Sequence, residues 1–191
     1  MDCKKAYKKL VNGNERFVNS TQINRSVGVS NNLKLVDSQK PFAAILTCSD
    51  SRVGVSEIFD TKLGDLFLIK NAGNIAFKSA IASIEYAVSI LGVRLILVLS
   101  HQNCGAVNYA KTVPECKSEK EKNIMHLLEP IREVIAKNKN ASTEEITLEN
   151  ANYSAKNIIK NSIIISEKVK EESVKIITGY YHIETGKVTF Y

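Results

Sequence analysis

Five side chains capable of metal or acid–base chemistry fall into two short groups that lie far apart in the chain. The first group carries a thiol, a carboxylate and a guanidinium in Cys48, Asp50 and Arg52, and the second carries His101 and Cys104. Thiolate and imidazole groups suit zinc, whose protein sites are usually tetrahedral. These residues therefore predict a zinc ion with three protein ligands, whose fourth position is left for water or for Asp50.

Two other interpretations of the cysteines and the histidine are a closed structural zinc site and buried thiols beside a hydrogen-bonded core histidine. A single His-x-x-Cys pattern would favour one of these. A structural zinc knuckle, however, usually contains paired Cys-x-x-Cys units, and the sequence has none. Because both groups follow an apolar run that predicts a strand, the open site is favoured.

Asp50 and Arg52 are separated by one residue. In an extended segment, side chains two positions apart point the same way, so a two-pronged carboxylate–guanidinium pair is feasible. A surface ion pair is the plain alternative. Beside Cys48, the pair is expected to act on the metal site, where Arg52 holds Asp50 off the metal and Asp50 accepts a hydrogen bond from zinc-bound water.

The elements that must position these groups are short apolar runs, at 42–46 and 95–99. Each ends abruptly in polar residues, which is typical of strands buried on both faces of a parallel sheet. A further buried strand is predicted at 66–69, and a helix capped by Ser79 follows it as far as about Leu91. Ligand sites of open α/β sheets lie at the carboxyl ends of the strands, which is where both groups fall.

The remaining segments complete an α/β fold, a central mainly parallel β-sheet flanked by helices, with an N-terminal helical arm. Residues 1–191 are expected to form a single domain, of which 1–40 are the N-terminal helix and a polar arm that favours an oligomer. The other predicted elements are helices at 3–18, 53–60, 105–111 and 124–135, one long helix from a capping box at Ser142 towards Lys170, and strands at 174–178 and 188–191.

Composition excludes several classes of protein. The chain has 191 residues and a net charge of +6, but its lysines are scattered among glutamates rather than gathered in a basic stripe, so no nucleic-acid partner is expected. No apolar stretch reaches the ~18 residues that a membrane span needs, and no apolar leader follows Met1, so we expect a cytoplasmic protein without a membrane partner. The four cysteines are too few for a disulfide scaffold, and Cys3 and Cys116 are interpreted as free thiols.

Several motifs together resemble those of the β-class carbonic anhydrases, in the same order and spacing over roughly residues 5 to 191. They are Cys-Ser-Asp-Ser-Arg-Val at 48–53, Lys-Asn-Ala-Gly-Asn at 70–74, Glu-Tyr-Ala-Val at 85–88, His-x-x-Cys-Gly-Ala at 101–106 and the closing Gly-Tyr-Tyr and Thr-Gly-Lys-Val-Thr-Phe segments at 179–181 and 185–190. The sequence departs from the family at Ser100, where glycine is usual, at Lys70, where arginine is usual, and at 53–55, which lacks the common proline.

The resemblance implies one zinc ion per chain, bound by Cys48, His101 and Cys104, with Asp50 either paired to Arg52 or in the fourth zinc position. It also implies a homodimer or homotetramer whose pockets lie at the dimer interface and whose N-terminal arm lies on the partner. Substrate-binding roles are implied for a further set of residues, Gln39, Phe67, Tyr86 and Gly105.

The predicted activity is the reversible hydration of carbon dioxide to bicarbonate and a proton through zinc-bound hydroxide, a carbonate dehydratase or lyase reaction. Zinc can lower the pKa of bound water from 15.7 to about 7. The first alternative is a catalytically silent, zinc-stabilised binding or regulatory protein on the same scaffold. The second is a hydrolase for a related linear molecule such as carbon disulfide.

Overall fold

The computed structural model describes residues 1–23, 35–113 and 119–191. Cys116, interpreted above as a free thiol, and much of the predicted arm lie outside these residues. The elements in chain order are α1 (Cys3–Val18), β1 (Ala43–Cys48), α2 (Val55–Ile58), β2 (Leu66–Asn71), α3 (Lys78–Ser89), β3 (Leu95–His101), α4 (Gly105–Thr112), a 3-10 turn (Glu119–Glu121), α5 (Lys122–Lys137), α6 (Thr143–Asn161), α7 (Ile163–Lys170), β4 (Lys175–Tyr181) and β5 (Val188–Phe190).

In the described residues, five strands form one sheet in the order β2-β1-β3-β4-β5, in which only β5 runs antiparallel. The chain moves from β1 to β2 on one side and then crosses back over β1 to β3 on the other. The strand order therefore reverses between β1 and β3, and the carboxyl ends of these two strands form the crevice where open α/β sheets bind ligands. The expected α/β fold with a mainly parallel sheet is confirmed.

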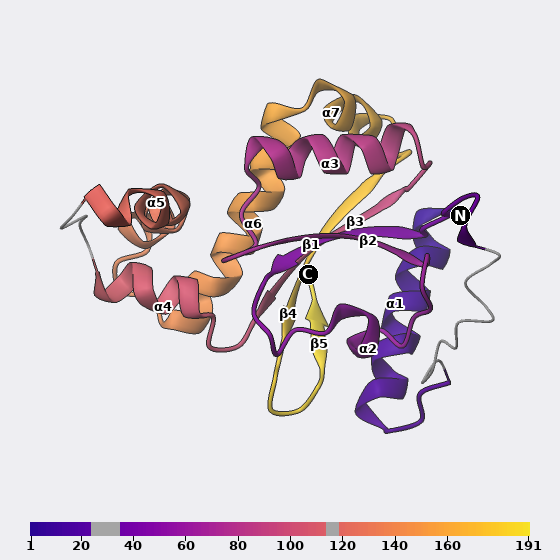
Figure 1. Ribbon diagram of the computed structural model, residues 1–191, viewed down its shortest axis with the longest axis horizontal. Coiled ribbons are helices and arrows are strands. Elements are labelled where there is room, and N and C mark those ends of the chain that lie inside the picture. Colours follow the sequence, from indigo (N-terminus) through magenta and orange to yellow (C-terminus); the bar gives the residue numbers. More distant parts are fainter. Residues whose placement is uncertain (24–34, 114–118) are drawn as a thin grey trace.

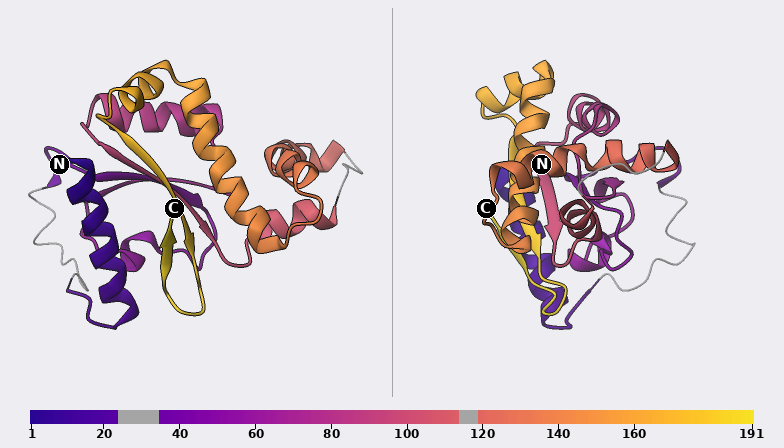
Figure 2. Two further views of the ribbon diagram at one scale, coloured as in Figure 1. Left: turned by 180° about the vertical axis from the view of Figure 1, so that it is seen from behind. Right: turned by 90° about the vertical axis from the view of Figure 1, so that its left-hand side faces the viewer.

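Helices cover both faces of the sheet (Figures 1 and 2). Alternate residues of β1 and β3 point to opposite faces, because side chains in a strand alternate. Ala44, Leu46 and Ile96 pack in one apolar cluster with α3, α6 and α7. Ala43, Ile45 and Leu97 pack in another with α1 and α2. The continuous burial of β1 and β3 explains why their sequences are apolar runs rather than alternating patterns.

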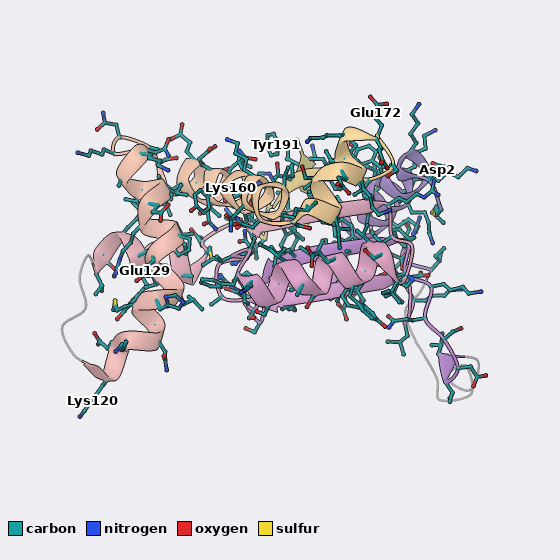
Figure 3. All side chains as sticks on the ribbon, turned by 90° about the horizontal axis from the view of Figure 1, so that it is seen from above. Asp2, Lys120, Glu129, Lys160, Glu172 and Tyr191 are labelled. Atoms are coloured by element: carbon teal, nitrogen blue, oxygen red, sulfur yellow. The ribbon has the colours of Figure 1, made fainter. Side chains whose placement is uncertain are left out.

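A helical lobe of α4 and α5 projects from the end of the sheet opposite the N-terminus. Figure 3 shows this from above, with Lys120 and Glu129 at one end of the molecule and Asp2 at the other. The apolar side chains of the lobe form a third core cluster, which includes Val107, Leu128 and Ile131 and reaches Cys48 and Cys104. This cluster closes one side of the crevice.

Three sequence predictions about elements are corrected. The strand at 66–71 is not buried on both faces, because it is the edge strand of the sheet, and its Leu68 is 39% exposed. The helix after it begins at Lys78, so Ser79 lies inside it and Phe77 occupies the cap position. The predicted long helix towards Lys170 is interrupted at Ser162, which is extended and whose hydroxyl caps α7 by accepting from the Ile165 amide.

The N-terminal helix is confirmed, and it packs on the sheet of its own chain, where Ala6 and Leu10 are fully buried. Asn14 fastens it to two other segments. Its amide nitrogen donates to the carbonyl oxygens of Ile58 (3.2 Å) and Gly186 (2.8 Å), and its side-chain oxygen accepts from the Val188 amide (2.8 Å). These bonds and the buried apolar contacts fasten α1 to the rest of its own chain.

We predict that Asn14→Ala destabilises the protein by about 2–3 kcal/mol, because it leaves buried backbone groups of three residues without their partner. Urea unfolding followed by circular dichroism measures this change in the free energy of unfolding. Asn12→Ala, on the exposed face of the same helix, is the matched control and should change stability by less than about 0.5 kcal/mol. Equal effects of the two substitutions would contradict the anchoring role of Asn14.

Within the described residues, no helix combines the length and the apolar content that crossing a membrane requires.

Candidate metal centre

The carboxyl ends of β1 and β3 bring the two predicted ligand groups together. Cys48 is the last residue of β1 and His101 the last of β3. A tight turn through Asn103, whose φ is +54°, then places Cys104 at the start of α4. The Sγ atoms of Cys48 and Cys104 lie 3.9 Å apart, and all three ligand atoms lie within 4.8 Å of one another.

The donor set is buried and has the form that a metal ion requires. Cys48 is 4% exposed, and His101 and Cys104 are fully buried. His101 Nδ1 lies 3.0 Å from the Gln102 carbonyl oxygen, to which it can donate a hydrogen. This contact leaves Nε2 as the nitrogen with a free lone pair, and Nε2 has no hydrogen-bond partner in the described part of the chain. A carbonyl oxygen that accepts from the other ring nitrogen, and so fixes the orientation of the ring, is typical of metal-binding histidines.

The two sulfur atoms of the cluster lie in hydrogen-bond contact. The Cys104 thiol lies in hydrogen-bond contact with Cys48, which lowers the pKa of Cys48 and raises that of Cys104. The Gly73 amide also donates to Cys48 Sγ (3.4 Å) and favours the thiolate. Metal binding to cysteine requires deprotonated sulfur, and these contacts favour a thiolate at Cys48. The residues therefore fit a zinc ion.

Asp50 and Arg52 form the predicted two-pronged pair. Arg52 Nε donates to Asp50 Oδ1 (2.9 Å) and Arg52 Nη2 to Asp50 Oδ2 (2.8 Å), while the Arg52 amide also donates to Oδ1 (3.0 Å). These hydrogen bonds hold the pKa of the Asp50 carboxyl well below its usual range. Asp50 Oδ2 lies 3.9 Å from His101 Nε2, so the ionised carboxylate borders the ligand cluster.

Two of the three departures from the family pattern, Lys70 and Ser100, have local hydrogen-bond partners. The Lys70 ammonium donates to the Val53 carbonyl oxygen (3.0 Å) and so supports the loop that carries Asp50 and Arg52. The Ser100 hydroxyl, buried in β3, donates to the Gly179 carbonyl oxygen of β4 (3.0 Å). Neither side chain intrudes on the ligand cluster.

The structure does not gather the four residues with implied substrate-binding roles around the cluster of the same chain. Gly105, the first residue of α4, directly follows Cys104. Phe67, by contrast, pairs in register with Ala44, so it lies about 13 Å along the sheet from Cys48. Its ring centroid is 6.1 Å from that of Tyr86, and Tyr86 and Gln39 line one open cavity of about 410 Å³.

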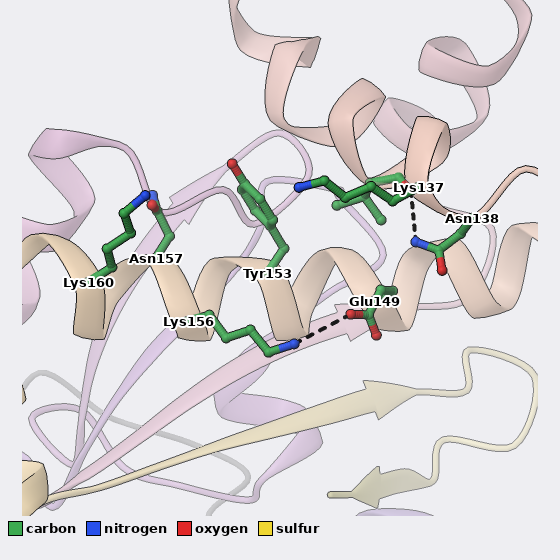
Figure 4. A pocket seen from close by; sticks show the side chains of 8 residues that line it. Lys137, Asn138, Glu149, Tyr153, Lys156, Asn157 and Lys160 are labelled. Carbon is green, nitrogen blue, oxygen red and sulfur yellow. Dashed lines mark hydrogen bonds and ion pairs between the residues drawn. The ribbon is translucent and has the colours of Figure 1, made fainter.

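Another cavity, of about 360 Å³, lies between α5 and α6, where Lys137, Tyr153 and Lys160 line it (Figure 4). Lys156, on the same helix as Tyr153, forms an ion pair with Glu149 (3.8 Å). None of the ligand residues lines this cavity. It is a surface feature separate from the candidate metal centre.

Sequence reasoning missed two residues that shape the site. The Gly73 amide donates to Cys48, and the Asn103 carbonyl oxygen accepts from Arg52 Nη2 (3.1 Å). The signal for Gly73 was its place in the glycine-bearing polar segment after β2. The signal for Asn103 was its place in the short turn between the ligand residues His101 and Cys104. The sequence alone does not show in which direction the backbone groups of Gly73 and Asn103 point.

The fold and the site together define a class: an open α/β protein with a buried Cys-His-Cys centre at the point where its strand order reverses. The sequence model of the carbonic anhydrase family matches residues 43–188. Carbonic anhydrase 2 of Mycobacterium tuberculosis is 32% identical over 185 residues, covering 95% of this chain and 89% of that protein.

Solved structures agree with this assignment. The β-carbonic anhydrase CcaA is 26% identical with a TM-score of 0.75, over 98% of this chain and 88% of that one. A tetrameric β-carbonic anhydrase of Sordaria macrospora, 24% identical, superposes with a TM-score of 0.72 over 83% of this chain and 84% of that one. The chain belongs to the β-class carbonic anhydrases. It is accordingly an enzyme of this family.

Proposed function

We propose that this protein is a zinc-dependent carbonate dehydratase that interconverts carbon dioxide with bicarbonate and a proton. The observation that carries the proposal is the buried cluster of Cys48, His101 and Cys104, whose ligand atoms lie within 4.8 Å of one another. A closed structural site would have a fourth cysteine or histidine, whereas the group beside this cluster is the carboxylate of Asp50, which Arg52 already engages.

Cys48, His101 and Cys104 would hold one zinc ion per chain. When bound, zinc lowers the pKa of water to about 7 and so supplies hydroxide at neutral pH. Asp50 stays ionised because of Arg52, so it can accept a hydrogen bond from the attacking group and orient it towards the substrate. Arg52 keeps the Asp50 carboxylate from becoming a ligand itself.

We further propose that Gln39, Phe67 and Tyr86 act in the site of a partner subunit. They lie at or beside the edge strand β2 and α3, whose apolar side chains Leu68 and Tyr86 are 39% and 48% exposed. Pairing of two such surfaces in a homodimer would bring these three residues to the metal centre of the partner subunit. Gly105 would act at the metal centre of its own chain. The Sordaria macrospora relatives are tetrameric, so a homotetramer is the other assembly. We place the enzyme in the cytoplasm.

A stopped-flow assay with a pH indicator tests the proposal. We predict that zinc-loaded protein accelerates the hydration of carbon dioxide, that a chelator abolishes the acceleration, and that added zinc restores it. Circular dichroism before and after stripping checks that the fold survives.

Zinc-loaded, folded protein without hydration activity would overturn the proposal and support a silent binding protein. Sulfide release from carbon disulfide, without hydration of carbon dioxide, would instead identify the hydrolase.

A further inference from the structure

We propose that Asn150, on α6, is a positioning residue of the metal centre, which it serves by fixing the backbone of Gly73 against Cys48. The inference rests on the proposed function in so far as Cys48 binds zinc. Nothing in the sequence motifs points to Asn150, because it lies 77 residues from Gly73 and outside all of them.

The segment after β2 delivers a hydrogen bond to a metal ligand. The Gly73 amide donates to Cys48 Sγ at 3.4 Å. Gly73 has a φ of +80°, and a Cβ there would meet Ile131 Cδ1 at 2.9 Å and Ala106 Cβ at 3.3 Å. The Gly73 backbone thus has a left-handed conformation with little free space around it. The position of this backbone decides whether the Gly73 amide can donate to Cys48 Sγ.

Three polar side chains of α6, here called the polar ladder, form hydrogen bonds with the backbone of the 71–76 segment. Asn150, Ser154 and Asn157 are spaced so that they share one face of the helix. Asn150 Nδ2 donates to the Gly73 carbonyl oxygen at 2.7 Å. Ser154 Oγ accepts from the Ala76 amide (3.3 Å), and Asn157 Nδ2, labelled in Figure 4, donates to the Ala76 carbonyl oxygen (2.9 Å).

Asn150 is fully buried. A buried amide costs free energy unless it is hydrogen-bonded. Among the described residues, its Oδ1 has no hydrogen-bond partner, so the short bond to Gly73 is the interaction that its side chain contributes. An apolar side chain would fill the same space without the free-energy cost of burying an amide. The placement of an amide there is explained by the need to hold the Gly73 carbonyl, and with it the adjoining amide.

The consequence for the metal centre is electronic as well as geometric. An N–H group that donates to a thiolate ligand withdraws charge from the sulfur, and hydrogen bonds of this kind tune the metal that the sulfur binds. In a site with two thiolates, this withdrawal keeps the metal ion more electron-poor. Loss of Asn150 should let Gly73 shift and weaken the bond to Cys48.

The test compares Asn150→Ala with Asn152→Ala in the full-length protein. Asn152 lies on the same helix, but its side chain contacts Glu149 and Thr178 instead of the 71–76 segment. We expect Asn150→Ala to bind zinc about 10-fold more weakly in competition with a chromogenic chelator. We also expect it to shift the thiolate-to-metal charge-transfer band of the cobalt-substituted protein. Asn152→Ala should leave both unchanged.

Wild-type zinc affinity and an unshifted band in folded Asn150→Ala would overturn the inference, as would equal changes in both variants. If Asn150→Ala does not fold, Ser154→Ala replaces it; a smaller change in the same direction supports the ladder, and no change refutes it. Neither readout uses carbon dioxide. Zinc-loaded protein that fails to hydrate carbon dioxide therefore refutes the proposed function alone, while the affinity and the band still decide the role of Asn150.

Discussion

Replacing Cys104 by alanine is expected to abolish zinc binding and carbon dioxide hydration together, and Cys48→Ala and His101→Ala should do the same. Each substitution leaves two of the three clustered donors, and a zinc site with two protein ligands is not expected to retain the ion against a chelator. Metal analysis after gel filtration should find zinc falling from one ion per chain to near zero. The stopped-flow rate should fall to the uncatalysed background.

The remaining described cysteine supplies the control. Cys3, a free thiol on α1 whose Sγ contacts the Arg94 carbonyl oxygen at 3.0 Å, lies far from the ligand cluster in sequence and fold. Cys3→Ala should keep both zinc and activity. A folded chain that lacked Cys48, His101 and Cys104 but still hydrated carbon dioxide without zinc would end the account.

The second large effect is expected for Arg52→Ala, which should retain zinc and yet be nearly inactive. Without the guanidinium, the Asp50 carboxylate loses the hydrogen bonds that engage both of its oxygens. Oδ2 already lies 3.9 Å from His101 Nε2, so the metal becomes the nearest positive charge available to it. Asp50 is then expected to occupy the fourth position and exclude water.

Absorption spectroscopy of cobalt-substituted Arg52→Ala measures this change of ligand. Its spectrum should differ from that of the wild type, and the double variant Asp50→Ala/Arg52→Ala should regain the wild-type spectrum without regaining the rate. Arg52→Lys, which keeps the charge but loses the two-pronged geometry, should be intermediate in rate. An unchanged solvent ligand in cobalt-substituted Arg52→Ala would contradict the proposed role.

The parts of the fold that sequence predicted best are those in which local pattern and burial agree. The apolar runs of β1 and β3 indicated strands with ligands at their carboxyl ends, and the structure places Cys48 and His101 there. The Asp50–Arg52 pair was also predicted, but on the assumption of an extended segment. The structure forms the pair across a turn instead, in which the Val53 amide donates to the Asp50 carbonyl oxygen (3.1 Å). The capping box at Ser142 and Glu145 likewise marked the start of α6.

The predictions that failed depended on neighbours that a local pattern does not reveal. The apolar sequence of β2 does not show that this strand has a neighbour on only one side, and that position leaves Leu68 partly exposed. Ser162 interrupts an otherwise helical pattern by capping the next helix. The contact between Asn150 and Gly73 joins segments far apart in the chain, so no spacing rule could propose it.

The most direct test of the central claim is X-ray absorption at the zinc edge of the purified, zinc-loaded protein. The account predicts two sulfur ligands at about 2.3 Å and two nitrogen or oxygen ligands at about 2.0–2.1 Å, one from His101 and one from solvent. In Cys104→Ala, the sulfur contribution should be lost along with the metal. A shell of four protein ligands, fewer than two sulfurs, or no stoichiometric zinc in folded wild-type protein would contradict it.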